Sequence, residues 1–296
     1  MSKSPLKIKK LGLLFLLMLV VLSWGLAFVA IKYLLEVHGL SPMGLTALRY
    51  VPAGIISLAI MLIFYGPKRM MAAWNQEWRG IWLYGLTGVL GYNLALNFGE
   101  TRIAAGTASL IVGLSPIMTL VASRLALGEL ITFRKLAGII VAFAGLFVVV
   151  RWGANEPVSF NYLWGVLITL GAPLSWAIYT IVGKPMVGRE DPNLVTLSAI
   201  LWGSLPLSFF IPDSAAALPF RAWGALAFLT LVCTIFGFLV WSWALKKTEA
   251  ARLGVVVYLI PLVTVLAGTM LLGERVTVGL IVGGMVLISG VVLAET

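Results

Sequence analysis

The chain is dominated by long apolar runs that are separated by short polar segments. A helix of about 20 residues crosses the ~30 Å hydrocarbon core of a bilayer. Ten runs of about that length occur, at residues 11–31, 45–65, 80–99, 103–123, 135–150, 162–183, 194–211, 222–245, 253–272 and 276–294. They are apolar on every side, whereas the strands of a membrane barrel alternate with a period of two. We therefore predict an all-α integral membrane protein with ten transmembrane helices.

The composition excludes several other classes of protein. Hydrophobic residues make up 61% of the chain and charged residues 11%, against about 25% charged in soluble domains. A soluble enzyme, a disordered chain and a nucleic-acid binder are therefore excluded as first interpretations. The single cysteine, Cys233, and the single histidine, His38, argue against an internal disulfide and a histidine metal cluster. No phosphate-binding loop pattern is present, and we expect no cofactor and no nucleic-acid partner.

The basic residues predict the orientation of the chain. If the N-terminus is cytoplasmic, fifteen of the 21 Lys and Arg residues fall on the cytoplasmic side. We expect a multi-pass protein of the cell inner membrane, with residues 1–10 as a cytoplasmic tail and both termini cytoplasmic. The first apolar run is longer than the core of a signal peptide, so we expect it to remain as a span.

The chain also repeats itself weakly. Seven positions recur with a displacement of 145 residues, and they are Ala105, Pro116, Leu127, Gly128, Glu129, Gly138 and Gly145. Trp24 and Lys32 recur at Trp176 and Lys184, with a displacement of 152. We take residues 11–151 and 160–294 as two copies, joined by a connector at 152–159.

Each copy contains five predicted spans, an odd number, so the second copy must be inverted in the membrane. An inverted 5+5 repeat is typical of many secondary transporters, which bind solute near the bilayer midplane between the copies. The repeat therefore favours a transport function.

These features resemble the EamA-like family of the drug/metabolite transporter superfamily. The resemblance rests on two five-helix copies, each with an Ala-rich helix start, a mid-span proline and a Leu-Gly-Glu ending. The same family is also resembled by three further features, which are Trp24-Gly25, Lys32 and Arg49-Tyr50. The resemblance implies a ten-helix bundle that moves small metabolites, often amino acids and often outward. The two copies differ beside the mid-span proline: the residue before it is Ser115 in the first copy and Ile260 in the second.

Two prolines, Pro116 and Pro261, lie in the middle of paired spans. A proline removes a backbone donor and frees a carbonyl one turn earlier. We interpret both as hinges beside the solute, and Ser115 as a neighbouring solute contact. A simple packing kink is the alternative.

Polar residues are costly inside a span and therefore point to function. Asn93 and Asn97 share a helix face, beside Tyr92, and either line a cavity or join helices by hydrogen bonds. Arg49 and Lys32 lie near the outer ends of their spans. Either could attract an anionic solute, with Lys32 acting at the outer mouth, or could extend to the membrane interface.

Aromatic side chains are the second set of candidate solute contacts. Trp24 and Trp176 are paired by the repeat and could face each other. With Tyr92 they form the candidate aromatic lining, together with Tyr179, Trp241 and Tyr258. Packing within the bundle is the alternative for each.

Acidic residues are absent from the span centres, so proton coupling is not evident, and Glu100 and Glu249 come nearest. Glu129 and Glu274 are interpreted as helix caps, ahead of Thr132 and Thr277. Glycines at helix-packing spacing, as in Gly279 and Gly283, join helices within a monomer or form a homodimer.

The combined hypothesis is a secondary transporter, not an enzyme, that exports an amino acid or related organic solute by alternating access. Its partners are then the solute and membrane lipid. The alternatives are a membrane-embedded enzyme and a non-transporting structural membrane protein.

Overall fold

The computed structural model describes residues 5–127, 132–153, 159–247 and 259–295, and within these ranges the chain forms helices and no strand. The prediction of an all-helical protein is confirmed over these ranges. The helices are α1 (Pro5–Glu36), α2 (Pro42–Phe64), α3 (Gly66–Gly85), η1 (Leu86–Gly91), α4 (Tyr92–Glu100), α5 (Ala105–Val112), α6 (Ser115–Leu127), α7 (Phe133–Trp152), α8 (Phe160–Arg189), α9 (Pro192–Ser204), η2 (Leu205–Phe210), η3 (Asp213–Ala217), α10 (Phe220–Ala227), η4 (Phe228–Phe236), α11 (Gly237–Lys247), α13 (Leu259–Leu272) and α14 (Val278–Glu295).

Helix starts follow local sequence signals. Ser41 accepts a hydrogen bond from the amide of Gly44 at the start of α2, and Thr132 caps α7 in the same way. Asp191 caps α9, whose first residue is a proline. A short polar side chain before a helix accepts hydrogen bonds from the first backbone amides, which have no partner inside the helix. Proline is tolerated at the first position because the amide hydrogen that it lacks has no helical partner there.

Several helices are long and apolar enough to cross a membrane. Seven candidate spans of at least 18 residues occur in the described chain, and α13 and α14 are shorter apolar helices. The predicted run at 80–99 is not a single α-helix. It is a continuous path through α3, the π-helix η1 and α4, and Glu77 has non-helical backbone angles within α3. The equivalent run of the second half, α10–η4–α11, also contains a π-helix.

The helices pack in pairs that join the two halves of the chain. α7 lies along α14, and α2 lies along α9. α1 packs on α13, while α6 packs on α8. The α7–α14 contact is made at glycines: a Cβ at Gly145 would meet backbone atoms of Leu287, and one at Gly290 would meet those of Ala142. The small residues therefore join the fifth and tenth predicted spans within one chain.

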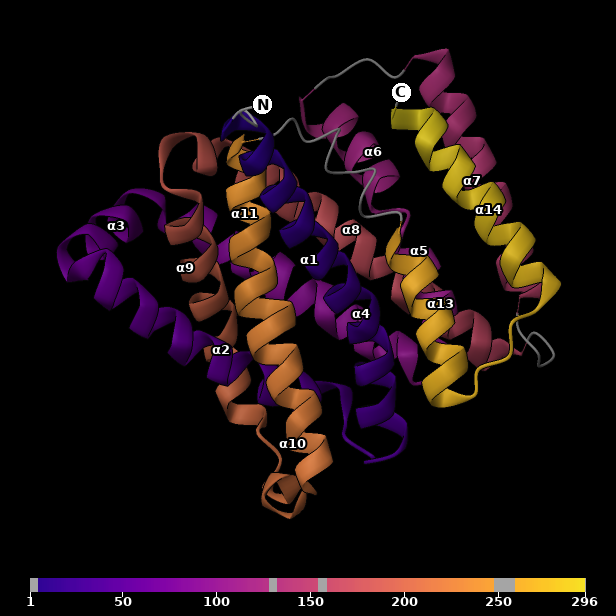
Figure 1. Cartoon of the computed structure of the whole chain (residues 1–296), viewed down its shortest axis with the longest axis horizontal. Coiled ribbons are helices and arrows are strands. Elements are labelled where there is room, and N and C mark those ends of the chain that lie inside the picture. The colour runs from indigo at the N-terminus through magenta and orange to yellow at the C-terminus, as the bar shows by residue number, and fades with distance from the viewer. Residues whose placement is uncertain (1–4, 128–131, 154–158, 248–258, 296) are drawn as a thin grey trace.

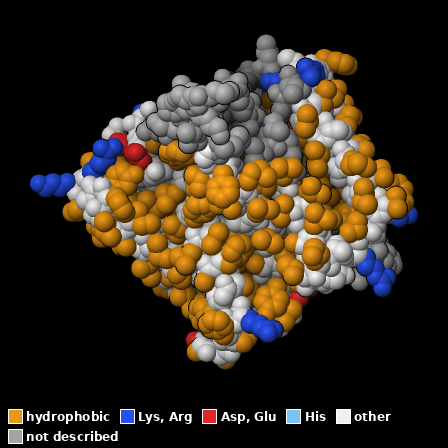
Figure 2. Space-filling model, viewed as in Figure 1, with side chains coloured by type: hydrophobic (Ala, Val, Ile, Leu, Met, Phe, Trp, Pro, Cys, Tyr) orange, Lys and Arg blue, Asp and Glu red, His pale blue; other side chains and the backbone are white. Residues whose placement is uncertain are grey.

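Much of the exterior is apolar. Hydrophobic side chains cover most of the face in Figure 2, whereas Lys and Arg gather at its edges. Phe64 is 77% exposed and Phe209 is 87% exposed. A soluble monomer does not expose apolar surface on this scale. We conclude that the chain is a multi-pass membrane protein.

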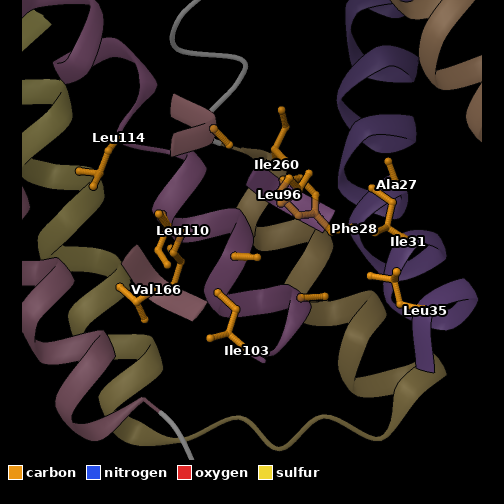
Figure 3. Close-up of a cluster of buried hydrophobic side chains, with 14 of the residues drawn as sticks. Ala27, Phe28, Ile31, Leu35, Leu96, Ile103, Leu110, Leu114, Val166 and Ile260 are labelled. Carbon is orange, nitrogen blue, oxygen red and sulfur yellow. The ribbon is translucent and has the colours of Figure 1, made fainter. Parts of the chain in front are cut away.

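A buried apolar cluster fills the bundle between α1, α4, α5, α8 and α13. Figure 3 shows part of it, with Phe28 and Ile31 of α1 facing Leu96 of α4 and Ile260 of α13. The cluster lies beside a cavity and forms part of its wall.

Candidate functional site

A cavity of about 550 Å³ lies between the two halves of the chain. It is lined from the first half by α1 to α6 and from the second half by α8, α11 and α13. Pockets for small metabolites are of this size and mix apolar walls with a few polar groups. The candidate solute contacts that line it are Trp24, Arg49, Tyr92, Ser115, Trp176, Tyr179 and Trp241, and the candidate hinges Pro116 and Pro261 line it too.

The wall is largely aromatic. The rings of Trp24 and Trp176, the pair related by the repeat, meet edge to face with centroids 6.4 Å apart. Trp241 packs against Trp24 at 5.4 Å, and Tyr179 stacks on Trp176 at 5.1 Å. The indole of Trp24 also donates to the carbonyl of Cys233 at 2.9 Å. These contacts fix the rings, so they form a preformed apolar surface for a solute.

Arg49 places a positive charge on the cavity wall. Its Nε donates to the hydroxyl of Thr234 at 3.0 Å, and its Nη1 donates to the amide oxygen of Asn93 at 3.2 Å. Its guanidinium carbon lies 4.9 Å from the centre of the Tyr50 ring. The ion pairs found among the described residues do not include Arg49. A buried cation held by neutral groups attracts an anionic group into the cavity.

The two π-helices converge on this arginine. Asn93 follows η1 and donates to the carbonyls of Val89 and Gly88, which lie four and five residues earlier. Thr234 belongs to η4 and donates to the carbonyl of Leu229, five residues earlier. Side chains that bond the widened turns of a π-helix stabilise it, and π-helices are frequent at functional sites. Here both polar partners of Arg49 are held in this way.

Asn93 and Asn97 do not line the cavity. Asn93 also donates to the Tyr50 hydroxyl at 2.9 Å, and Asn97 donates to the Thr46 hydroxyl at 2.9 Å. Both asparagines are buried, and these bonds join α4 to α2. Both asparagines therefore form hydrogen bonds that join helices, as in the second interpretation of the sequence. Asn93 touches the cavity wall only indirectly, through its bond to Arg49.

The chain breaks where Pro116 predicts a kink. α5 ends at Val112 and α6 begins at Ser115, so one apolar run is split into two helices. The proline leaves the carbonyl of Val112 without its helical partner, and the Ser115 hydroxyl donates to that carbonyl at 2.6 Å. Pro261 lies in the first turn of α13. Thr264, one turn later, donates to the carbonyl of Gly25 at 3.0 Å and joins α13 to α1.

Lys32 and Glu274 lie away from the lining, and one predicted contact cannot be placed. Tyr258 is outside the described residues. Lys32 is buried rather than extended to the interface, and its ammonium donates to the carbonyls of Glu100 and Ile103. Glu274 is a cap, but not for the helix that follows it. Its carboxylate accepts from the amides of Ala105 and Gly106, at the start of α5. The partner Glu129 is outside the described residues.

Several lining residues were not predicted as contacts. They include Tyr50, Tyr84, Thr119, Thr180 and Phe238. Tyr84 stacks on Tyr179 with centroids 3.7 Å apart. An aromatic residue inside an apolar run carries no signal that separates lining from packing, so the sequence could not single out the tyrosines and Phe238. The two threonines did carry a signal, because they are polar residues inside predicted spans. Within the described ranges, no group of three His, Cys, Asp or Glu side chains could hold a metal ion.

Known proteins are similar to this chain over nearly its full length. The model of the EamA-like transporter family matches residues 11–151 and 163–296. An uncharacterized transporter of Archaeoglobus fulgidus is 36% identical, with 93% of this chain and 95% of the relative covered. A "probable terminal-alkyne amino-acid exporter" of Streptantibioticus cattleyicolor is 30% identical, with coverages of 94% and 91%.

A "probable amino-acid metabolite efflux pump" of Salmonella typhimurium is 28% identical, with coverages of 93% and 91%. One crystal structure shares the fold with a TM-score of 0.68, at 19% identity and 96% coverage of both chains. Because the family model matches both halves, the chain belongs to the EamA-like transporter family.

Proposed function

We propose that this chain is a secondary transporter that exports amino acids or closely related organic solutes across the cell inner membrane. The observation that carries the proposal is the cavity itself, in which the Arg49 guanidinium faces an aromatic wall. An amino acid with an apolar side chain matches both features. Its carboxylate pairs with Arg49, and its side chain packs on the rings of Trp24 and Trp176.

The helix pairing supports an inverted repeat. Under the proposal, the chain crosses the membrane ten times, and α3–η1–α4 forms the third crossing. The two second spans, α2 and α9, pack together, as do the two fifth spans, α7 and α14. The first span of each half packs on the fourth span of the other half, in the pairs α1–α13 and α8–α6. Such reciprocal contacts are expected when a two-fold axis relates two inverted copies.

The same geometry supports alternating access. The cavity is lined by helices of both halves, so a relative motion of the halves can expose it to one side and then to the other. The break between α5 and α6 at Pro116 gives the first half a point at which its fourth span can bend. The export direction is supported by the names of two relatives, an exporter and an efflux pump.

Counterflow tests this proposal. The purified chain is reconstituted into liposomes that are loaded with an unlabelled amino acid, and uptake of the same labelled amino acid is followed for each of the twenty in turn. We expect transient accumulation that is greatest for apolar and aromatic side chains. If the folded protein gives no accumulation with any of the twenty, the proposed substrate class is wrong.

A further inference from the structure

Glu100, the last residue of α4, is a buried acid that the proposed site does not use. Its exposed fraction is 0%, and neither carboxyl oxygen has a hydrogen-bond partner among the described residues. A carboxylate in such a place costs several kcal/mol relative to water, so burial favours the neutral acid.

The neighbouring charges are already engaged elsewhere. The Lys32 ammonium donates to the backbone carbonyls of Glu100, at 2.7 Å, and Ile103, at 3.0 Å, and it forms an ion pair with Glu36. Glu274 is bound to the start of α5. Lys32 is thus close to the Glu100 carboxyl group but does not pair with it.

Among the described residues, no side chain donates a hydrogen bond to the carboxyl group of Glu100. Its electrostatic neighbours are Lys32 and Glu36 from α1 and Glu274 from the segment between α13 and α14, and Tyr92 lies on the same helix. Other ionisable groups of the described helices packed on α4 include Tyr33 of α1, Arg49 and Tyr50 of α2, and Tyr162 and Tyr179 of α8, and Arg102 lies in the turn after α4. Arg102 donates to the carbonyl of Phe98 and the hydroxyl of Thr101.

Glu100 also lies next to the end of the cavity. Tyr92 and Leu96 line the cavity, and Glu100 follows on the same face of α4, one turn further. On α1, Ile31 lines the cavity and Lys32 is the next residue. The bonds of Lys32 therefore join α1 to the α4–α5 turn next to the lining residues Ile31 and Leu96, which are labelled in Figure 3. We call these bonds the Lys32 seal.

We propose that Glu100 is a proton-binding site and that its proton controls the Lys32 seal. When Glu100 loses its proton to water, the new carboxylate requires a buried counter-charge, and the Lys32 ammonium is the cation beside it. The three donors of the Lys32 ammonium are bound to the two carbonyls and to Glu36. If Lys32 keeps its pair with Glu36, it reaches the new carboxylate by giving up a bond to a carbonyl. Deprotonation then loosens α1 from the α4–α5 turn, and protonation restores the bond. For transport, this inference rests on the proposed function, with one proton entering for each solute exported.

The proton itself can be observed without transport. Infrared spectroscopy of the purified full-length protein resolves the carbonyl stretch of a protonated carboxylic acid. We expect this band at neutral pH in the wild type and in Asp213→Asn, a control at an exposed acid, and its loss in Glu100→Gln. Lys32→Gln removes the counter-charge and should retain the band to a higher pH than the wild type. If Glu100→Gln and the wild type have identical spectra, the proposal is wrong.

The coupling is tested with labelled L-phenylalanine in proteoliposomes. One pH unit is a tenfold proton ratio, so a gradient of one unit drives about tenfold accumulation at one proton per solute. We expect this accumulation in the wild type and in Asp213→Asn. Glu100→Gln should retain counterflow at equal pH and lose the response to the gradient.

The outcomes separate the two proposals. If wild-type protein shows no counterflow, the proposed function fails for this solute, and the infrared spectra still decide whether Glu100 holds a proton. If the wild type shows counterflow without a response to the gradient, or if Glu100→Gln retains the response, the role of Glu100 in transport is overturned. A thermal unfolding curve of Glu100→Gln establishes that the variant is folded.

Discussion

At the scale of single residues, Arg49 combines charge and geometry in a way that lysine cannot reproduce. Its guanidinium bonds Thr234 and Asn93 with two different nitrogens and still faces the cavity. Lysine has a single point charge on a flexible stem, so it cannot hold both partners and a solute carboxylate at once. We expect Arg49→Lys to raise the half-saturating concentration for amino-acid counterflow about tenfold, the equivalent of one charged hydrogen bond.

The matched control is Arg221→Lys, which makes the same change at an exposed position at the start of α10. It should transport with wild-type affinity. An unchanged half-saturating concentration in Arg49→Lys, at equal expression, would remove Arg49 from the solute site.

Tyr65 gives a pH-dependent contribution to stability. Its hydroxyl donates to the Asp191 carboxylate at 2.9 Å, between α2 and α9. Burial and this hydrogen bond raise the pKa of Tyr65 from 10.0 to about 12. The folded protein therefore favours the neutral phenol, and the stabilisation is complete below pH 10 and is lost as the pH rises from about 10 to about 12.

We expect Tyr65→Phe to lower the free energy of unfolding at neutral pH by no more than about 1 kcal/mol, since the group is partly exposed and screened. The difference from the wild type should vanish above about pH 12. Tyr33→Phe is the control, because the Tyr33 hydroxyl has no hydrogen bond among the described residues. Thermal unfolding in detergent as a function of pH provides the measurement, and a difference that persists at high pH would contradict the assignment.

The predicted residues show what a sequence can reveal about a site. Trp24 and Trp176 were paired by the repeat, and the structure brings their rings together. Lys32 is predicted near the outer mouth, and the structure shows it buried, with its ammonium donating to carbonyls 68 and 71 residues further along the chain. Contacts over such separations depend on helix packing, which local sequence patterns do not contain.

At the scale of elements, the apolar runs located most helices, but they did not reveal the π-helices. The run at 80–99 predicts one regular helix, because hydropathy is insensitive to the hydrogen-bond pattern within a helix. η1 exists because Asn93 bonds the carbonyls of its widened turn and is itself held by Tyr50 and Arg49. The residues that hold Asn93 in place, Tyr50 and Arg49, belong to α2, so the run at 80–99 alone does not contain the information that predicts η1.

The backbones of α7 and α14 approach each other closely at their glycines, and a substitution there tests whether this approach is required for stability. A Cβ on Gly145 would meet the backbone of Leu287 and would lie 2.8 Å from the carbonyl oxygen of Gly283. Backbone cannot move aside without separating the helices, so we expect Gly145→Ala to destabilise the protein by about 1–3 kcal/mol. Thermal unfolding of the purified protein measures the loss.

Gly224→Ala is the control for this substitution. Gly224 lies inside α10, and no atom lies within 4 Å of a Cβ built there. The same change should therefore be neutral or stabilise by about 0.5–1 kcal/mol, because alanine favours a helix more than glycine does. Equal effects at the two positions would show that helix propensity, rather than close packing, determines the result.

At the scale of the whole molecule, the proposed number of spans in each half predicts that the two halves are inverted relative to each other. α1 begins and α14 ends at the same end of the bundle, as Figure 1 shows, whereas α10 begins at the opposite end. Equivalent loops of two inverted copies must then lie on opposite sides of the membrane. The segment before α3 in the first half and the segment before α10 in the second half are such a pair.

Cysteine labelling tests this arrangement directly. Cys233 is the single cysteine and is buried, so Cys233→Ala gives a parent without a reactive thiol. On this parent, Lys68→Cys and Ser214→Cys place one thiol at an exposed position near each loop. With cytoplasmic termini, a membrane-impermeant maleimide should label Ser214→Cys in intact cells and Lys68→Cys only after permeabilisation. Labelling of both from the same side would mean that the halves are parallel, and a cavity between them could not alternate by exchange of two inverted conformations.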